Sequence, residues 1–433
     1  MSSYLIKNIQ LANGNVVDIA IENQKIVELS PNLTFKAEVI DGSGLIAVSG
    51  LVDLHTHLRE PGFEGSETIL TGSKAAAKGG FTSVHAMANT APVADNAAVV
   101  EQVYALGKSA GYVQVQPIGA VTVNLEGKQL SDMGKMNKSQ ARVTVFSDDG
   151  KCVSDSLIMR RALEYAKSFD GVIAQHAQDP ALTVNAQMNE GDLSLKLGLT
   201  GWPKVAEQAI IARDVLLTEE VGSRLHICHV STAGSVEIIR WAKARGINVT
   251  AEVTPHHLLL TEDLVSDYNP LYKVNPPLRT QQDVQALREA VADGTIDIVA
   301  TDHAPHTKDS KDCEWGEAAF GMLGLETAAA IVQTTLVNTG LISWSRFEEV
   351  LSTNPAKIGK LTDQGQPIAV GSFANLVLID SNRKQTIGLE GESKSANNPY
   401  VGMELNGVVK HTLYKGTLTV KDGVVQKLGE TND

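Results

Sequence analysis

Apolar and polar positions alternate in a regular way along most of this chain. From about residue 47 to residue 359, short runs rich in β-branched residues are separated by longer segments with the apolar spacing of helices. We expect strands that end near His57, Ala88, Ala120, Asp149, His176, Val230, Pro255 and Asp302. Helices are predicted within residues 66–80, 155–169, 202–222 and 233–246, several of which begin after Ser, Asp or Pro and end at Gly. Eight such units in about 310 residues predict an α/β fold, a TIM-like (β/α)8 barrel rather than an open sheet.

The two ends of the chain follow a different pattern. Residues 4–30 alternate polar and apolar positions around an Asn13-Gly14 turn signal, and residues 374–384 and 408–425 alternate in the same way. This is typical of antiparallel β structure, but neither end is long enough to form a stable sandwich alone. We therefore predict a small β-sandwich domain built from residues 1–50 together with 360–433, beside a barrel of residues 51–359.

Composition and charge narrow the class of protein. The chain has 433 residues, of which 43% are hydrophobic and 20% charged, and no apolar run approaches the roughly 20 residues that cross a bilayer. The first residues lack the pattern of a secretion signal, and Cys152, Cys228 and Cys313 are far apart, so a cytoplasmic location is expected. The net charge of −13 argues against nucleic acid or a membrane surface as a partner. An anionic small-molecule substrate would need local cations to overcome that charge.

Side chains that commonly bind metals occupy the predicted strand ends. His55 and His57, two residues apart, would point to the same face of an extended strand. The ends of four later strands carry Asp149, His176, His229 and Asp302. Taken singly, a histidine could be a hydrogen-bonded core residue, and Asp302 could be a helix cap. Barrel enzymes carry their chemistry at these strand ends, and six such groups exceed the four ligands usual for one zinc ion. The set therefore predicts a pair of divalent ions that share a bridging carboxylate.

Several motifs resemble one enzyme family over nearly the whole chain. They are DLHTHLREPG from Asp53, TPHHLLLTE from Thr254, NPPLR from Asn275, ATDHAPHT from Ala300 and FGMLGLET from Phe320. As a set they resemble the amidohydrolase superfamily and, within it, the dihydroorotases. The resemblance implies that the six strand-end residues bind Zn²⁺, with one or two ions per subunit and two favoured.

The bridging position needs a choice between neighbouring residues. Many amidohydrolases use a carboxylated lysine at the end of strand four, whereas the segment FSDDG resembles the dihydroorotase branch that uses aspartate there. Asp149 shares a strand face with the small residues Val145 and Ser147, which suit a crowded barrel lumen, and the family motif also points to the second aspartate. We expect Asp149 to be the ligand and Asp148 to support it. Lys151 is the alternative, as a carboxylated lysine.

The resemblance also implies a substrate pocket on the same rim. The expected contacts are Arg59, Asn89 and His306 to a substrate carboxylate, and His57, Asn275 and the backbone of Phe320 and Gly321 to the rest of the substrate. Outside this family context, Arg59 could be a surface arginine paired with Glu60 or Glu64. The family usually has proline where this chain has Ala88 and Ala319, and either difference could loosen a substrate loop.

The implied reaction is the reversible closure of N-carbamoyl-L-aspartate to (S)-dihydroorotate with loss of water, a step of pyrimidine biosynthesis. In the hydrolytic direction, Asp302 would be the catalytic residue that takes a proton from the attacking water and passes it to the leaving nitrogen. The nearest alternatives are hydantoinase, dihydropyrimidinase and allantoinase, but the lysine usual in those enzymes is missing here. A noncatalytic scaffold subunit for aspartate transcarbamoylase is an alternative of another class, although such a subunit should have lost ligands. A homodimer is expected, and association with aspartate transcarbamoylase stays open.

Overall fold

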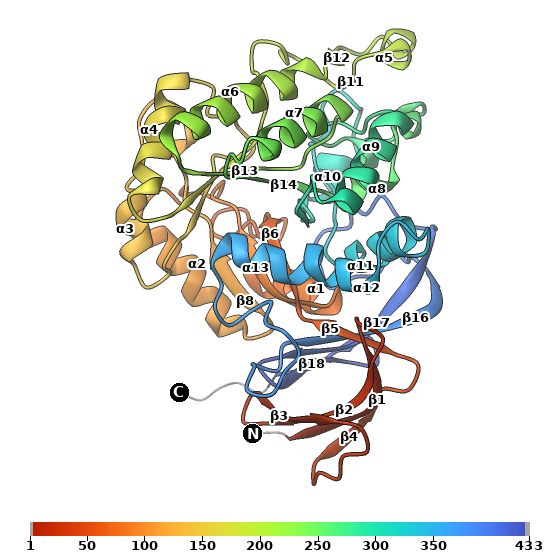
Figure 1. Ribbon diagram of the computed structural model, residues 1–433. Helices are drawn as coiled ribbons and strands as arrows, with labels where there is room; N and C mark the ends of the chain where they lie inside the picture. The colour runs from red at the N-terminus through yellow and green to blue at the C-terminus, as the bar shows by residue number, and fades with distance from the viewer. Residues whose placement is uncertain (1–2, 429–433) are drawn as a thin grey trace.

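The computed structural model describes residues 3–428, and within them eight parallel strands close into a barrel (Figure 1). The barrel strands are β6 (Leu51–Thr56), β7 (Phe81–Ala86), β8 (Gln114–Pro117), β9 (Val145–Phe146), β10 (Val172–Gln175), β13 (Arg224–Ile227), β14 (Val249–Val253) and β15 (Ile298–Val299). They form a three-stranded and a five-stranded sheet, which parallel bridges join between Gly119 and Phe146 and between Thr56 and His303. The predicted (β/α)8 barrel is therefore confirmed.

Helices form the outer layer of the barrel. The longer ones are α1 (Ile69–Lys78), α2 (Ala97–Ala110), α4 (Ser156–Lys167), α6 (Val205–Val221), α7 (Ala233–Ala244) and α9 (Gln281–Asp293). The shorter ones are α3 (Met133–Lys138), α8 (Pro255–Leu259), α10 (Lys308–Lys311), α11 (Ala328–Val332), α12 (Trp344–Glu348) and α13 (Asn354–Gly359). Local sequence sets their ends: the Asp155 carboxylate caps α4 by accepting from the amides of Leu157 and Ile158, and Gly222 ends α6 in the left-handed conformation. The four predicted helical segments contain α1, α4, α6 and α7.

A small excursion interrupts the βα alternation between β10 and α6. It contains the parallel pair β11 (Met188–Asn189) and β12 (Gly201–Trp202) with the short helix α5 (Asp192–Leu197) between them. The excursion lies at the end of the barrel away from the β domain (Figure 1). The sequence pattern did not predict these short elements.

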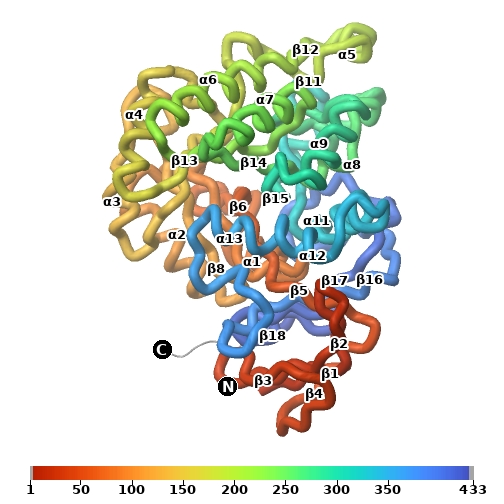
Figure 2. Tube along the Cα trace, viewed as in Figure 1, coloured from red at the N-terminus to blue at the C-terminus, as the bar shows by residue number. Residues whose placement is uncertain are grey.

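The two chain ends form one sheet beside the barrel, as predicted (Figure 2). Its nine strands within the described residues are β1 (Tyr4–Leu11), β2 (Val16–Glu22), β3 (Lys25–Ser30), β4 (Glu38–Asp41), β5 (Ile46–Ser49), β16 (Leu376–Thr386), β17 (Glu404–Tyr414), β18 (Thr417–Lys421) and β19 (Val424–Val425). β5 pairs antiparallel with β16, and one apolar cluster contains Ile6 and Ile19 together with Leu376 and Leu413. The stretches predicted to be antiparallel pair with one another in that way, and β1 also pairs in parallel with β4 and β5, which the pattern did not predict.

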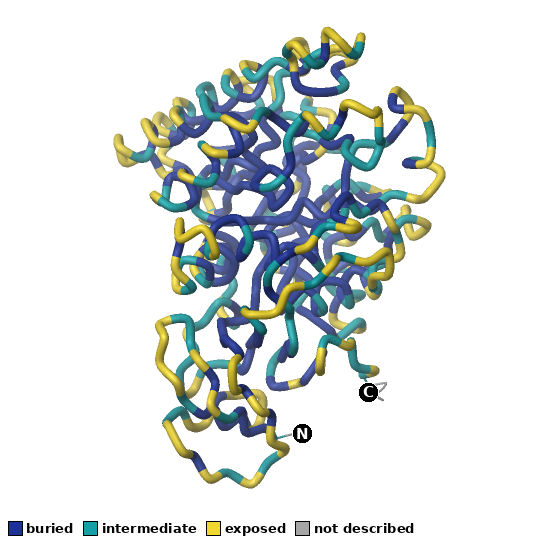
Figure 3. Tube along the Cα trace, turned by 90° about the vertical axis from the view of Figure 1, so that its right-hand side faces the viewer, coloured by how far each residue is buried: buried dark blue, intermediate teal, exposed yellow. Residues whose placement is uncertain are grey.

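Buried residues concentrate inside the barrel wall and its lumen (Figure 3). One large cluster, which includes Phe146 and Leu225, packs between strands and helices. A smaller cluster of Met87, Ile118, Val145, Val172, Ala174 and Cys228 fills the lumen. Val145 thus faces inward while Phe146 faces the helices, which puts Asp149 on the inward face if the alternation continues. Within residues 3–428, no helix combines the length and hydropathy needed to cross a bilayer.

We propose the domain boundaries where the chain passes between these two bodies. β5 of the β domain ends at Ser49 and barrel strand β6 begins at Leu51. On the return, α13 ends at Gly359 and β16 begins at Leu376. These positions fit a barrel of residues 51–359 and a β domain of residues 1–50 and 360–433.

Candidate metal centre

Six polar side chains meet at the carboxyl ends of five barrel strands. They are His55 and His57 at the end of β6, Asp149 after β9, His176 after β10, His229 after β13 and Asp302 after β15. None is more than 5% exposed. The structure therefore brings together all the residues that the sequence analysis named as metal ligands.

The backbone leaves the strand conformation at two of these positions. His229 and Asp302 have φ angles of 31° and 47°, in the left-handed region that non-glycine residues rarely adopt. Such conformations cost energy and are held in place by surrounding structure, often at functional sites. They explain why β13 and β15 each end three residues before the ends that the sequence predicted at Val230 and Asp302.

The six side chains form two groups with Asp149 between them. In the first group, His57 Nε2 and His55 Nε2 lie 3.1 and 3.4 Å from Asp302 Oδ1. In the second group, His176 Nδ1 lies 2.8 Å from His229 Nε2. Asp149 contacts both groups: its Oδ1 is 3.4 Å from His55 Nε2 and 3.3 Å from each nitrogen of the second group, and its Oδ2 is 3.3 Å from His57 Nε2.

The separations of 3.1–3.4 Å match what a metal ion requires of its ligands, whereas the 2.8 Å between His176 Nδ1 and His229 Nε2 is shorter. Zinc–ligand bonds of 2.0–2.1 Å in tetrahedral geometry place neighbouring ligand atoms about 3.3 Å apart. Two groups have ligand atoms that all lie within 4.8 Å of one another around Asp149: His55, His57 and Asp149 on one side, and Asp149, His176 and His229 on the other. A third such group joins His55 to Cys228 and Glu252. The donor set of imidazoles and carboxylates suits zinc and similar divalent ions.

Hydrogen bonds on the far side of the rings fix which nitrogen faces the centre. His55 Nδ1 donates to Glu252 Oε1 at 2.5 Å, and His57 Nδ1 donates to Asn89 Oδ1 at 2.9 Å. His176 Nε2 donates to Gln178 Oε1 at 2.7 Å. The other nitrogen of each ring is then an acceptor directed at the cluster, and the buried Nε2 of His55 has no hydrogen-bond partner within residues 3–428. Histidines that bind metals are usually oriented in this way, by a hydrogen bond from the ring nitrogen that does not face the metal.

The cluster also shifts the pKa values of its members. Burial disfavours ionisation of Asp149 and Asp302, but the adjacent imidazoles outweigh it and hold the pKa of both carboxyls below the usual range. Burial likewise disfavours protonation of His55, yet the carboxylates of Asp149, Glu252 and Asp302 raise the pKa of that ring. The carboxylates are therefore ionised, and a divalent cation would replace the protons that the histidines otherwise attract.

Two residues that the sequence analysis missed, the buried Glu252 and the half-buried Gln178, contact the clustered side chains. Glu252, on β14, accepts from His55 Nδ1 and also from the amide of His229 at 3.2 Å and from His226 Nε2 at 3.0 Å. Gln178 accepts from His176 and also from Asn275 Nδ2 at 3.1 Å, so it joins the metal cluster to the substrate side. A charged residue in a short, mostly apolar strand was the available signal for Glu252.

Asp148, which was expected to support Asp149, and Lys151, the alternative ligand, lie outside both clusters. The Asp148 carboxylate accepts from the amides of Val121 and Thr122 at 2.8 and 3.0 Å, so it anchors the neighbouring loop. Burial raises the pKa of Asp148. Lys151 is exposed and is not part of either cluster.

Arg59 and His306 lie side by side at the mouth of the barrel. Arg59 Nε donates to Pro305 O at 3.1 Å, and Arg59 Nη2 lies 3.5 Å from His306 Nε2. His306 Nε2 donates to Phe320 O at 2.7 Å, so it cannot also accept from the arginine. Within residues 3–428 Arg59 forms no ion pair, and Glu60 and Glu64 contact backbone amides instead. Burial lowers the pKa of Arg59 to about 10, and burial together with the charge of Arg59 lowers that of His306 to about 3.

The remaining predicted contacts border the same space. Asn275 Oδ1 is buried and has no partner within the described residues. Gly321 has a φ of 137°, and an added Cβ would come within 2.7 Å of Ala304 and 2.8 Å of His306 Nε2, so a side chain would disrupt the pocket. Its amide donates to Lys273 O at 2.9 Å.

The two positions where the family usually has proline fit this chain in different ways. The Ala319 amide donates to Ser310 O at 2.9 Å, a bond that proline could not form, and Ala319 O accepts from Lys311 Nζ at 2.7 Å. The loop from Pro305 to Gly321 is therefore tied together at Ala319. Ala88 O accepts from the amides of Thr90 and Ala94.

Known proteins resemble this chain in sequence and in structure. A family model described as dihydro-orotase-like matches residues 44–235. A dihydroorotase of Streptomyces coelicolor is 61% identical over 425 residues, 98% of this chain and 99% of the relative, and one of Mycobacterium tuberculosis is 50% identical over 428 residues, 98% and 100% of the two chains. Among solved structures, an L-hydantoinase of Arthrobacter aurescens has a TM-score of 0.88 at 25% identity, with 99% of this chain and 98% of that chain covered. A dihydropyrimidinase of Brevibacillus agri has a TM-score of 0.84 at 25% identity, with 98% and 96% covered.

Proposed function

The chain belongs to the dihydroorotase family of the amidohydrolase superfamily, and we propose that its six clustered side chains hold two zinc ions at the centre of the reaction. It is a cyclic amide hydrolase that interconverts N-carbamoyl-L-aspartate and (S)-dihydroorotate, a step of pyrimidine biosynthesis. The proposal concerns how its own residues carry out that reaction.

One observation carries the proposal of two ions. The carboxylate of Asp149 lies between two groups of nitrogen donors, 3.3–3.4 Å from each ring nitrogen. A single ion could not use all the donors on both sides, because zinc usually takes four ligands. We assign His55, His57 and Asp302 to one ion, His176 and His229 to the other, and Asp149 to both.

Proton transfer is assigned to Asp302. When bound, divalent ions lower the pKa of a water molecule and polarise the ring carbonyl of the substrate. The neighbouring imidazoles keep Asp302 ionised, so its carboxylate can accept the proton that the water loses. In the hydrolytic direction Asp302 then gives this proton to the ring nitrogen that leaves, and in the cyclisation direction it removes the proton from that nitrogen.

The substrate carboxylate is assigned to Arg59. A partly buried guanidinium without a counter-ion is unusual, and its Nη2 is not used by His306. A carboxylate in front of Arg59 would form the charge-assisted bonds that the described chain leaves open. The Nδ2 amide of Asn89 would also donate to this carboxylate, and His306 would do so by turning its Nε2–H from the Phe320 carbonyl to the substrate.

The ureide edge of the substrate is assigned to the opposite wall. Asn275 Oδ1 is a buried acceptor without a donor, which suits a ring N–H. The carbonyl of Phe320 accepts from His306 and keeps a second lone pair for the substrate, while Gly321 leaves room for the ring. His57 belongs to the metal cluster through its Nε2 and contacts Asn89 through its Nδ1, so it borders the substrate site.

The alternatives differ in the substrate that they predict. Hydantoinases and dihydropyrimidinases share the fold, but neutral rings would leave Arg59 without a partner. A scaffold subunit would not need a cluster of six side chains suited to binding metal ions. The test is hydrolysis of dihydroorotate, hydantoin and dihydrouracil by purified protein of measured metal content. We expect dihydroorotate to be preferred at least about tenfold in kcat/KM, the value of one charged hydrogen bond. Preference for a neutral ring would contradict the assignment of Arg59.

Zinc identity, assembly and location complete the proposal. We propose zinc from the donor set, a homodimer, and a cytoplasmic enzyme that could associate with aspartate transcarbamoylase. Elemental analysis tests the metal, and light scattering with and without the transcarbamoylase tests the assembly. An enzyme that is monomeric in both samples would contradict the homodimer and the association with the transcarbamoylase.

A further inference from the structure

A segment of the β domain reaches across to the substrate pocket. We call residues 387–403, which join β16 to β17, the strap. It contacts the loop that follows β6: Lys394 Nζ donates to Glu64 O and Ser395 Oγ donates to Ser66 O, both at 2.6 Å. Tyr400, which is fully buried, packs in an apolar cluster with barrel residues that include Met322. The strap is thus held to the barrel near its middle and toward its C-terminal end.

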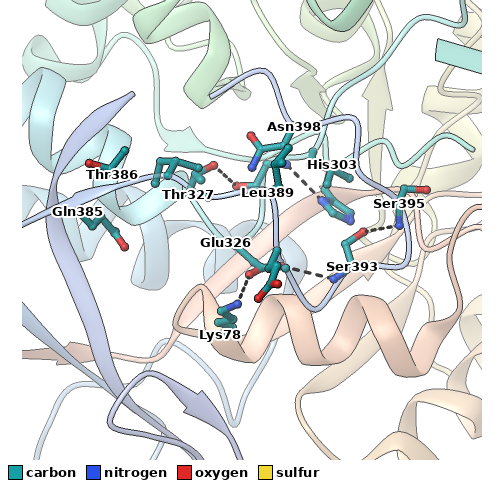
Figure 4. Close-up of a pocket in the computed structure, with 16 residues that line it drawn as sticks. Lys78, His303, Glu326, Thr327, Gln385, Thr386, Leu389, Ser393, Ser395 and Asn398 are labelled. Atoms are coloured by element: carbon teal, nitrogen blue, oxygen red, sulfur yellow. Dashed lines mark hydrogen bonds and ion pairs between the residues drawn. The ribbon is translucent and has the colours of Figure 1, made fainter. Parts of the chain in front are cut away.

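Figure 4 shows how the strap is fixed along its length. Glu326 pairs with Lys78 Nζ at 2.9 Å and accepts from the amide of Ser393 at 3.4 Å, and Ser393 Oγ accepts from the amide of Ser395. The cavity drawn there, of about 150 Å³, lies between strap and barrel and is lined by none of the six metal-cluster residues. This cavity is therefore separate from the metal cluster, and any link between the strap and the active site must run through individual strap side chains.

Asn397 is the strap residue that enters the pocket wall. It is 3% exposed, and every polar atom of its side chain is bonded to the barrel. Its Nδ2 donates to Ala304 O at 2.9 Å and to Gly321 O at 3.3 Å, and its Oδ1 accepts from the His306 amide at 3.1 Å. Its own carbonyl accepts from the Leu323 amide at 3.1 Å.

These bonds join the two stretches of chain that border the substrate. The first stretch, 304–306, follows Asp302 and carries His306 together with the Pro305 carbonyl that holds Arg59. The second stretch, 320–321, carries the carbonyl that accepts from His306. Asn397 spans both from behind, and it has no polar atom left for a substrate.

We propose that Asn397 is a positioning residue that sets the separation of His306 and Gly321 and so the place of Arg59 in the carboxylate site. The inference rests on the proposed substrate pocket. Only an amide of this length supplies two donated bonds and one accepted bond here. Aspartate would keep the acceptor but turn a carboxylate toward two carbonyl oxygens, and alanine would leave all three partners without a bond.

The test compares Asn397→Ala and Asn397→Asp with Asn398→Ala on the same strap. Asn398 lines the cavity of Figure 4, which is separate from the substrate pocket. Within the described residues, its side chain forms one hydrogen bond, in which Oδ1 accepts from the Tyr400 amide. For both Asn397 variants we expect KM for dihydroorotate to rise at least about tenfold, with kcat within about threefold of the parent. Asn398→Ala should keep the parental KM. Zinc content and melting temperature are measured for each protein, because a loss confined to KM is not expected from a general loss of structure.

A double-mutant cycle with Arg59→Met gives the decisive comparison. If Asn397 acts through Arg59, Asn397→Ala should change kcat/KM by less than about threefold in the Arg59→Met background. Parental KM in both Asn397 variants, or a full additive loss in the double variant, overturns the proposal while leaving the carboxylate site intact. If Arg59→Met itself loses nothing, the carboxylate site fails and the proposal fails with it. If neither Asn397 variant folds, Asn397 is required for the fold and the proposal is rejected.

Discussion

Replacing Glu252 by glutamine removes one buried negative charge from behind His55 with little change of shape. The Oε1 atom of Glu252 accepts from His55 Nδ1 at 2.5 Å and from the His229 amide at 3.2 Å. A glutamine oxygen can keep both bonds. Its amide group would then face His226 Nε2, which can accept when the His226 proton moves to Nδ1, 2.8 Å from Thr250 Oγ1. The variant therefore tests the charge rather than the packing.

The expected loss is in metal affinity. A hydrogen bond to a charged group contributes about 1.5–3 kcal/mol and a neutral one about 0.5–1.5 kcal/mol, so the exchange should cost about 1–1.5 kcal/mol. This corresponds to about a tenfold weaker zinc affinity at the ion that His55 binds. Glu252→Ala should lose more, about 10²-fold, because His55 Nδ1 and His226 Nε2 lose their partner altogether.

Glu207→Gln is the matched control. Glu207 is 3% exposed and accepts from the Ser231 amide at 3.1 Å and from Ser235 Oγ at 2.6 Å, but it touches none of the six ligands. Zinc is titrated into metal-depleted protein against a coloured competing chelator, and the melting temperature of the metal-free proteins is recorded. We expect Glu207→Gln to bind zinc within about threefold of the parent, whatever its stability. Equal zinc affinity of parent and Glu252→Gln, or an equal loss in Glu207→Gln, would refute the role of Glu252.

Three further substitutions test the assigned roles. Asp302→Asn should lower kcat by at least about 10²–10⁴-fold in steady-state assays, and a variant with full metal content and near-parental kcat would contradict Asp302 as the base. Arg59→Met should lower kcat/KM for dihydroorotate at least about tenfold while sparing any activity on a neutral ring, and parental kinetics would favour hydantoinase-like specificity. Lys151→Met should stay within about twofold of the parent because Lys151 is exposed; activity that is lost and then restored by a short carboxylic acid would support the carboxylated-lysine alternative.

The sequence predicted the barrel and the metal cluster because both impose strong local patterns. Parallel strands buried on both faces appear as short apolar runs in the sequence. Because active-site residues of such barrels lie at the carboxyl ends of the strands, candidate metal ligands follow these runs directly. Asp149 could be chosen over Asp148 because the two-residue period of a strand separates their directions, and Asp148 instead caps the amides of Val121 and Thr122.

The supporting residues could not be predicted, because their importance depends on contacts between distant parts of the chain. Glu252 lies 197 residues from His55 in the sequence, and Gln178 gains its meaning from Asn275, 97 residues away. Asn397 falls in a stretch that the sequence assigned to the β domain, yet its side chain bonds to Ala304, His306 and Gly321 of the barrel. That Arg59 has no counter-ion among residues 3–428 likewise became visible only in the folded chain.

The central claim is that Asp149 joins two metal ions, one held with His55, His57 and Asp302 and the other with His176 and His229. X-ray data collected from crystals of the active enzyme on either side of the zinc absorption edge test it most directly. The account predicts two anomalous peaks, each about 2.0–2.2 Å from an oxygen of the Asp149 carboxylate. The two peaks could share one oxygen or lie at different oxygens of that carboxylate. A single peak, or peaks away from Asp149, in protein that hydrolyses dihydroorotate would contradict it.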